Sequence, residues 1–191
     1  MRGLYAITPE GPGLVEKVRA ALEGGIALLQ YRNKHGSLDE AEEIARLARE
    51  RRVPLIVNDD VELALAVDAD GAHLGRDDGD LPAARKKLGS KILGASCYDR
   101  LELARAAVAA GADYVAFGSV FASSTKPGAV RAPLSLFGND LGVPKCAIGG
   151  ITLANAPQAI AAGADLLAVI SDLFDAPDIA ARAKAYGKLF G

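Results

Sequence analysis

Two short groups of acidic residues have side chains that suit a hard metal ion. Asn58-Asp59-Asp60 ends one apolar segment, and Asp77-Asp78 follows the next apolar segment by a few residues. Carboxylate oxygens are typical ligands of Mg²⁺, and phosphate oxygens of a substrate often complete its coordination shell. Asp59 and Asp78 are therefore candidate ligands of one Mg²⁺ ion. The alternatives are that Asp60 caps a following helix and that Asp77 is simply solvated.

Cationic and amide side chains alternate in the segment Gln30-Tyr31-Arg32-Asn33-Lys34. In a strand this alternation places Gln30, Arg32 and Lys34 on one side, where two cations could bind a polyphosphate. The alternative is a solvated strand end in which Arg32 pairs with a neighbouring carboxylate.

Two other regions suit phosphate binding. The segment 123–128, Ser-Ser-Thr-Lys-Pro-Gly, combines hydroxyl groups with a cation, although the same residue types are common in ordinary turns. The segment 147–151 ends in paired glycines, and Ile170-Ser171 ends the last apolar segment. Backbone amides after the last two strands form a common phosphate site in barrel enzymes, although Gly149 could serve only a tight turn.

Neither histidine has a nucleophile partner nearby in the sequence. His73 lies in a short apolar segment and is expected to be a hydrogen-bonded core residue, whereas His35 adjoins a glycine in a surface loop. A Ser-His-Asp hydrolase is therefore not supported. Cys97 and Cys146 lack the spacing of a zinc site or a disulfide framework, so both are expected to be buried, reduced thiols.

These candidates lie mainly where short apolar segments end. Eight such segments are expected to be strands: 4–8, 27–32, 55–58, 72–74, 92–96, 114–118, 146–150 and 166–171. Most are continuously apolar, which is typical of parallel strands covered by helices on both faces. Helical periodicity lies between them, introduced by the capping-box pair Ser37 and Glu40 and again by Asp99 and Glu102.

About eight βα units favour a single-domain (β/α)8 TIM barrel over residues 1–191, with short connections. A weak internal repeat, 109–116 and 161–168, supports this fold because each copy reads as a helix end that turns into a strand. The carboxyl ends of barrel strands converge on one rim. Residues far apart in the sequence would therefore surround one ligand.

The charge balance excludes some partners. The 22 Lys and Arg residues against 24 Asp and Glu give a net charge of -2, so we expect no broad basic surface for nucleic acid or an anionic membrane. No apolar run approaches membrane-spanning length, and the first residues lack the features of a secretory signal. We expect a cytoplasmic protein, and the sequence does not indicate its oligomeric state.

An ordered series of short motifs resembles the thiamine phosphate synthase family. The motifs span nearly the whole chain and lie at 4–8, 30–34, 57–59, 71–75, 94–96, 123–126, 148–151 and 169–171. The resemblance implies transfer of a hydroxymethylpyrimidine group from its diphosphate to the nitrogen of a hydroxyethylthiazole phosphate. The products would be thiamine phosphate and pyrophosphate. A carboxylated form of the thiazole phosphate is left open as the second substrate.

The resemblance also implies a mechanism. Departure of pyrophosphate would leave a carbocation stabilised by the pyrimidine, so the protein mainly binds the leaving charge and orients the thiazole nitrogen. No general base is required, which is consistent with the lack of a histidine-centred arrangement.

Roles then follow residue by residue from the matching motifs. The residues implied to contact the pyrimidine diphosphate are Gln30, Arg32, Lys34, Asn58 and Lys126. Asp59 and Asp78 would hold Mg²⁺, and Ser96 would lie beside the pyrophosphate. The residues implied to receive the thiazole phosphate are Ser123, Thr125, Gly150, Ile170 and Ser171. Catalytic stabilisation of the leaving group would come from Arg32, Lys34, Ser96 and Lys126.

Two motifs depart from the family's usual pattern. Gly75-Arg76-Asp77-Asp78 stands where Gly-Gln-x-Asp is common, so a metal role for Asp77 is left open. The segment 123–126 replaces Thr-x-Thr-Lys and preserves its hydroxyl character.

Two other functions compete with the synthase. A thiazole tautomerase would not need both carboxylates, and the segment 118–121 lacks a histidine that could act as its base. A phosphate-ligand sensor without turnover could also use this fold.

Overall fold

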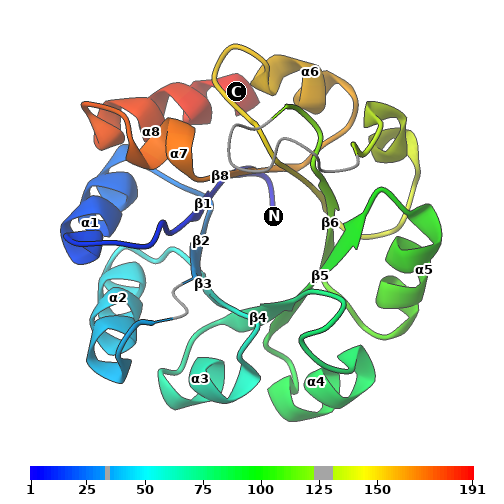
Figure 1. Ribbon diagram of the computed structural model, residues 1–191, viewed down its shortest axis with the longest axis horizontal. Helices are drawn as coiled ribbons and strands as arrows, with labels where there is room; N and C mark the ends of the chain where they lie inside the picture. Colours follow the sequence, from blue (N-terminus) through cyan, green and yellow to red (C-terminus); the bar gives the residue numbers. More distant parts are fainter. Residues whose placement is uncertain (33–34, 123–130) are drawn as a thin grey trace.

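The structure is a computed structural model that describes residues 1–32, 35–122 and 131–191. Eight parallel strands pair in chain order and close into a barrel, with β8 beside β1 (Figure 1). The strands are β1 Gly3–Ile7, β2 Leu28–Tyr31, β3 Leu55–Asn58, β4 Gly71–Leu74, β5 Ile92–Tyr98, β6 Tyr114–Gly118, β7 Lys145–Ile148 and β8 Leu166–Val169. The predicted TIM barrel is confirmed, and each strand overlaps an expected segment.

Helices surround the barrel (Figure 1). The α-helices are α1 Leu14–Gly24, α2 Leu38–Glu50, α3 Val61–Ala66, α4 Leu81–Leu88, α5 Leu101–Ala109, α6 Ala156–Ala161, α7 Ser171–Phe174 and α8 Ile179–Gly187. Two short 3-10 helices are η1 Leu134–Gly138 and η2 Lys188–Phe190. The described part of the connection between β6 and β7 contributes η1, so this unit departs from the expected βα pattern. Within the described ranges, no helix has both the length and the apolar character needed to cross a bilayer.

The predicted helix starts are confirmed at two of three positions. The Ser37 hydroxyl accepts a hydrogen bond from the Glu40 amide at the start of α2, and Asp60 caps α3 in the same way. The expected cap at Asp99 is wrong. Helix α5 has Arg100 at its N-cap position, without a side-chain cap, and the Arg100 guanidinium instead bonds Glu102 at 2.6 Å.

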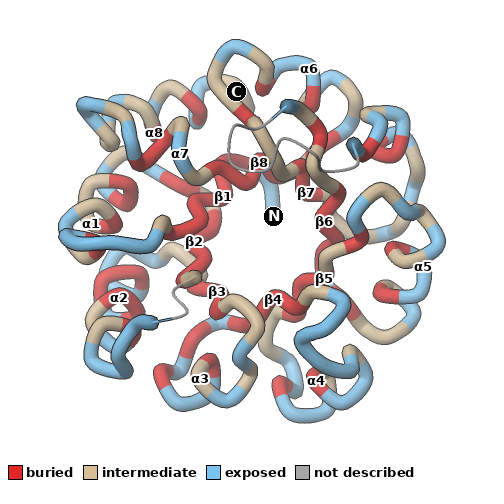
Figure 2. The backbone as a smooth tube through the Cα atoms, in the orientation of Figure 1, coloured by how far each residue is buried: buried red, intermediate tan, exposed pale blue. Residues whose placement is uncertain are grey.

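Successive side chains along the strands pack into two separate cores. One core fills the barrel interior and includes Tyr5, Leu28, Tyr114 and Cys146. The other lies between the outer face of the strands and the helices, so the strands are buried on both sides (Figure 2). This double burial explains why the strand segments are continuously apolar. Cys97 and Cys146 are free, buried thiols, as expected.

Three aspartates join neighbouring strands at their amino ends. Asp70, Asp113 and Asp165 directly precede β4, β6 and β8. Each carboxylate accepts a hydrogen bond from a backbone amide at the start of the preceding strand, at 2.8, 2.7 and 2.9 Å, respectively. We call these contacts the aspartate clamps. Two of them lie in the repeated segments 109–116 and 161–168.

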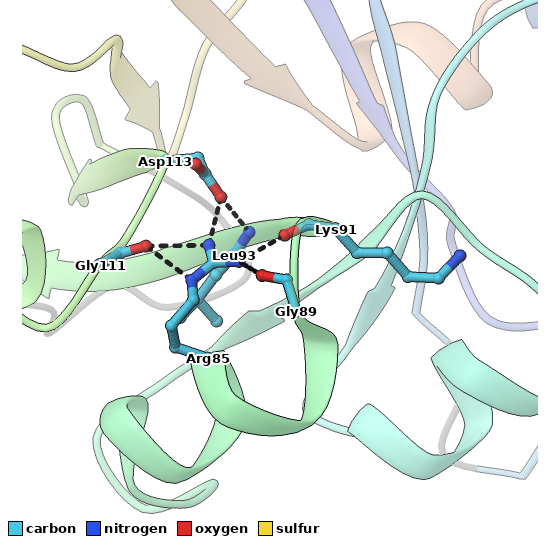
Figure 3. A network of polar contacts seen from close by, with 6 residues as sticks. All are labelled: Arg85, Gly89, Lys91, Leu93, Gly111 and Asp113. Atoms are coloured by element: carbon cyan, nitrogen blue, oxygen red, sulfur yellow. Dashed lines mark hydrogen bonds and ion pairs between the residues drawn. The ribbon is translucent and has the colours of Figure 1, made fainter.

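Arg85 of α4 reinforces one clamp (Figure 3). Its guanidinium pairs with Asp113 and donates hydrogen bonds to three carbonyl groups, those of Gly89, Lys91 and Gly111. Because the Asp113 carboxylate also accepts from the Leu93 amide, Arg85 connects α4 to the starts of β5 and β6. This network lies at the amino ends of the strands, opposite the rim where the candidate site residues gather.

Candidate active site

The two predicted metal ligands, Asp59 and Asp78, meet at the carboxyl ends of β3 and β4. Asp59 directly follows β3 and has a left-handed backbone with φ of 63°, a conformation that side chains other than glycine adopt infrequently. Its amide donates to the His73 carbonyl at 2.8 Å, and its carboxyl group lies within hydrogen-bonding reach of Asp78. The Asp78 carboxylate in turn accepts from the Gly75 amide at 2.9 Å. The expected pair is therefore brought together, with Asp78 next to Asp59.

The electrostatics of this pair fit a cation. Burial and the neighbouring Asp78 carboxylate raise the pKa of Asp59 to about 6, because both disfavour a second negative charge there. Among the described residues, no group of three or more His, Cys, Asp or Glu side chains is arranged as a metal site. Two carboxylates suit Mg²⁺ well, since this ion usually takes one or two protein carboxylates and completes its shell with water and phosphate oxygens.

Arg32 and Gln30 approach this site from β2. The Arg32 guanidinium is close enough to Asp59 to lower the pKa of that carboxyl group, which partly offsets the effect of Asp78. The backbone of Arg32 is fixed by the buried Thr8 hydroxyl, which accepts from its amide at 2.8 Å and donates to its carbonyl at 3.2 Å. Gln30 is buried, and its side-chain amide bonds the Tyr5 hydroxyl group in the barrel interior. Lys34 lies outside the described residues.

Asn58, Ser96 and Arg76 complete the described part of this rim. The Asn58 side-chain amide donates to Asp59 at 2.5 Å. Ser96 of β5 is partly exposed, and its hydroxyl lies 2.8 Å from Nε2 of His73. Arg76 lies over the ring of Tyr98, 4.8 Å from the ring centre, so this departure from the usual family motif adds a cation beside β5.

The described candidates for binding the thiazole phosphate, Gly150, Ile170 and Ser171, lie where β7 and β8 end. Gly149 and Gly150 follow β7 with φ of 100° and 63°, and Ser171 begins α7 after β8. A Cβ atom on Gly149 would lie 2.2 Å from the Ser119 hydroxyl oxygen, and one on Gly150 would lie 2.3 Å from the Ala122 carbonyl oxygen. Both glycines are thus required by local packing, whether or not an anion binds. Ser123, Thr125 and Lys126 lie outside the described residues.

A family model described as thiamine monophosphate synthase matches residues 4–173. The chain belongs to the thiamine monophosphate synthase family. It is 61% identical to a thiamine-phosphate synthase of Aromatoleum aromaticum, with 100% of this chain and 97% of that protein covered. It is 56% identical to a thiamine-phosphate synthase of Chromobacterium violaceum, again with 100% and 97% covered.

Solved structures support the same family and fold. A thiamine phosphate pyrophosphorylase from Pyrococcus furiosus is 36% identical, with a TM-score of 0.88, and covers 98% of this chain and 95% of its own. A 3-hexulose-6-phosphate synthase superposes with a TM-score of 0.77 over 100% of both chains, but its 18% identity indicates a shared fold alone. The family resemblance in the sequence motifs is therefore confirmed.

Four buried residues beneath the rim were not among the predicted site residues: Thr8, Tyr5, Tyr114 and His73. Thr8 holds the backbone of Arg32, and the other three form hydrogen bonds that connect Gln30 to Ser96. His73 was expected to be a hydrogen-bonded core residue, and this is confirmed, but its partner is a candidate site residue. Strand alternation could have indicated this contact, because it gives His73 the same interior orientation as Gln30 and Ser96.

Proposed function

We propose that the chain transfers a hydroxymethylpyrimidine group from its diphosphate to a hydroxyethylthiazole phosphate, forming thiamine phosphate and releasing pyrophosphate. Membership of the thiamine monophosphate synthase family supports this reaction. The observation that carries the site assignment is the meeting of Arg32, Asp59 and Asp78 at the ends of adjacent strands. A cation beside a carboxylate pair suits a diphosphate bound together with Mg²⁺.

The proposed mechanism is dissociative. The carbon–oxygen bond to the diphosphate breaks first, and the thiazole nitrogen then adds to the pyrimidine carbocation. Asp59 and Asp78 would hold Mg²⁺, which when bound supplies positive charge to the diphosphate oxygens. Arg32 would add charge from β2, and the Ser96 hydroxyl would donate a hydrogen bond to the departing pyrophosphate. Asn58 would orient Asp59 and contact the pyrimidine diphosphate together with Gln30.

The remaining assignments rest on the family motifs. Lys34 and Lys126 would stabilise the leaving group, whereas Ser123 and Thr125 would contact the thiazole phosphate. Gly150, Ile170 and Ser171 would complete the thiazole phosphate site at the ends of β7 and β8. The close approach of Gly150 to the Ala122 carbonyl supports this grouping, because Ala122 immediately precedes Ser123 in the sequence.

A two-substrate assay tests the proposed function. The purified protein is incubated with the pyrimidine diphosphate, the thiazole phosphate and Mg²⁺, and both thiamine phosphate and pyrophosphate are measured. Equal amounts of the two products are expected. A tautomerase would isomerise its thiazole phosphate without releasing pyrophosphate, and a sensor would bind ligand without turnover. Running the assay in parallel with the carboxylated thiazole phosphate identifies the preferred second substrate.

A further inference from the structure

A chain of hydrogen bonds crosses the barrel interior beneath the rim. The Gln30 amide nitrogen lies 2.6 Å from the Tyr5 hydroxyl oxygen, which lies 2.7 Å from the Tyr114 hydroxyl oxygen. Tyr114 lies 2.8 Å from Nδ1 of His73, and Nε2 of His73 lies 2.8 Å from the Ser96 hydroxyl oxygen. These residues come from β2, β1, β6, β4 and β5, so the chain joins opposite sides of the barrel. We call it the interior chain.

We assign one direction of hydrogen donation to the interior chain by counting donors from Gln30 onward. The Gln30 amide nitrogen donates to the Tyr5 oxygen, and Tyr114 is the other described partner of the Tyr5 hydroxyl group, so we assign the Tyr5 hydrogen to Tyr114. The Tyr114 hydrogen then goes to Nδ1 of His73, which must be unprotonated. A neutral imidazole with unprotonated Nδ1 carries its hydrogen on Nε2 and donates it to Ser96. The hydroxyl hydrogen of Ser96 is left to donate to another group.

The burial of the chain keeps its members in these protonation states. Tyr5 is 1% exposed, Tyr114 0%, Gln30 2% and His73 7%. Nδ1 of His73 faces the Tyr114 hydroxyl and Nε2 faces the Ser96 hydroxyl, so in the assigned direction one ring nitrogen accepts and the other donates. The same burial raises the pKa of both tyrosines, which remain protonated donors. Among the described residues, no buried side-chain nitrogen or oxygen lacks a hydrogen-bond partner, so the described network is complete.

The barrel makes room for this chain at one specific point. A Cβ atom on Gly94 would lie 2.2 Å from Cζ of Tyr114, so only glycine at this interior position admits the ring. The Tyr114 ring also stacks on His73 with 5.5 Å between ring centres and meets Tyr5 edge-on at 5.8 Å. The rings therefore have little freedom to turn away from their partners.

We propose that His73 is a positioning residue that, through the interior chain, commits the Ser96 hydroxyl to donate its hydrogen to the anionic diphosphate. The identity of the anion rests on the proposed function. The direction of hydrogen donation along the interior chain does not depend on it. Because the Ser96 oxygen accepts from Nε2 of His73, the hydroxyl group cannot turn to donate its hydrogen to that nitrogen. The serine hydroxyl is thus oriented before the ligand binds, which lowers the cost of forming the new hydrogen bond.

The direction of hydrogen donation along the interior chain is tested by ¹⁵N NMR of the His73 imidazole. The sequence contains only two histidines, so the variant His35→Gln leaves His73 as the single signal source. At pH 7 we expect a protonated, pyrrole-type Nε2 and an unprotonated, pyridine-type Nδ1. The opposite tautomer, or a doubly protonated ring, would overturn the proposal. This experiment requires no change in the interior chain and no turnover, so its result is independent of the proposed function.

The consequence for Ser96 is tested by a double-mutant cycle under single-turnover conditions. His73→Asn keeps an oxygen that can accept from Tyr114 but removes the donor to Ser96, so we expect a ~10- to 100-fold slower rate, as for other groups that orient a ligand-contacting residue. In the Ser96→Ala background the same change should cause no further loss. An equal loss in both backgrounds would show a merely structural effect and refute the positioning role.

Two controls separate positioning from instability. Ile56→Val shortens another fully buried interior side chain and should leave the single-turnover rate unchanged. His73→Gln can return a donor to the position of Nε2 and should recover part of the rate lost in His73→Asn. A His73→Gln variant that is folded but no faster than His73→Asn would argue against the donor to Ser96. If the substituted proteins do not fold, the NMR tautomer alone decides the proposal.

Discussion

The Asn58 side-chain amide lies 2.5 Å from a carboxylate oxygen of Asp59 and holds this group beside Asp78. Asn58 thus supplies a neutral donor to one of two crowded carboxylates. The contact stabilises the ionised form of Asp59, whereas Asp78 and burial oppose it. A divalent cation would relieve the remaining repulsion.

We predict that turnover requires Mg²⁺ and that Asp59→Asn slows it at least ~100-fold, because the variant removes one metal-binding carboxylate. Asp60→Asn is the matched control, since asparagine also caps helices well and Asp60 caps α3. Metal affinity is measured separately by Mn²⁺ titration with electron paramagnetic resonance. Full activity in chelator, with substrate consumption verified, would reject the metal requirement.

A second pair of variants decides between the adjacent aspartates after β4. Asp78 interacts with Asp59 and accepts from the Gly75 amide, so Asp78→Asn should weaken Mn²⁺ binding and slow turnover. Asp77 is exposed, and Asp77→Asn should change either quantity less than about twofold, as for an ordinary surface position. The reverse order of effects would transfer the metal role to Asp77.

The third prediction concerns the space for Tyr114. Gly94→Ala should displace the Tyr114 ring and destabilise the protein by ~1–3 kcal/mol, because an added methyl group has no room in this interior layer. Gly138→Ala in η1 is the control, since nothing lies within 4 Å of its added Cβ atom. Urea unfolding gives the free energies. Equal stability of Gly94→Ala and the unchanged protein would mean that the barrel accommodates the methyl group.

Arg85 is expected to affect stability without affecting chemistry. Arg85→Met leaves three carbonyls and Asp113 without their guanidinium partner, so we expect a loss of about 2 kcal/mol in the free energy of unfolding. The kcat should be unchanged because the network lies at the amino ends of the strands. Arg105→Met on the exposed face of α5 controls for loss of an arginine. A large fall in kcat with native stability would contradict this separation.

The proposed thiazole phosphate site is best tested at Ser171. Gly150 is a poor choice for substitution because any side chain there would collide with the Ala122 carbonyl. Ser171 is exposed at the start of α7, so Ser171→Glu should add negative charge and raise the KM for thiazole phosphate with little loss of stability. Ser135→Glu, at an exposed position in η1, is the control. An unchanged KM would move the phosphate site elsewhere.

The strands and the acidic pair could be predicted from the sequence, whereas the interior chain could not. Continuous apolar segments indicate buried parallel strands, and residues after adjacent strands must lie close together, as Asp59 and Asp78 do. The contact between Tyr5 and Tyr114 joins β1 and β6, which are not neighbours in the sheet. It depends on how the closed barrel staggers its strands, which the pattern within any single strand does not reveal. The prediction that Asp99 caps a helix was wrong. Arg100 occupies the N-cap position of α5, and its side chain pairs with Glu102.

The aspartate clamps divide the barrel into modules of two strands. Asp70, Asp113 and Asp165 join the pairs β3–β4, β5–β6 and β7–β8, respectively. In the pair β1–β2 the residue before β2 is Ala27, which has no carboxylate to form such a contact. The chain ends are also adjacent, because the Arg2 guanidinium donates to the Phe190 carbonyl at 3.3 Å. The molecule is therefore suited to circular permutation: a short linker can join the present ends, and new ends opened between β2 and β3 would leave every clamp within one unbroken module.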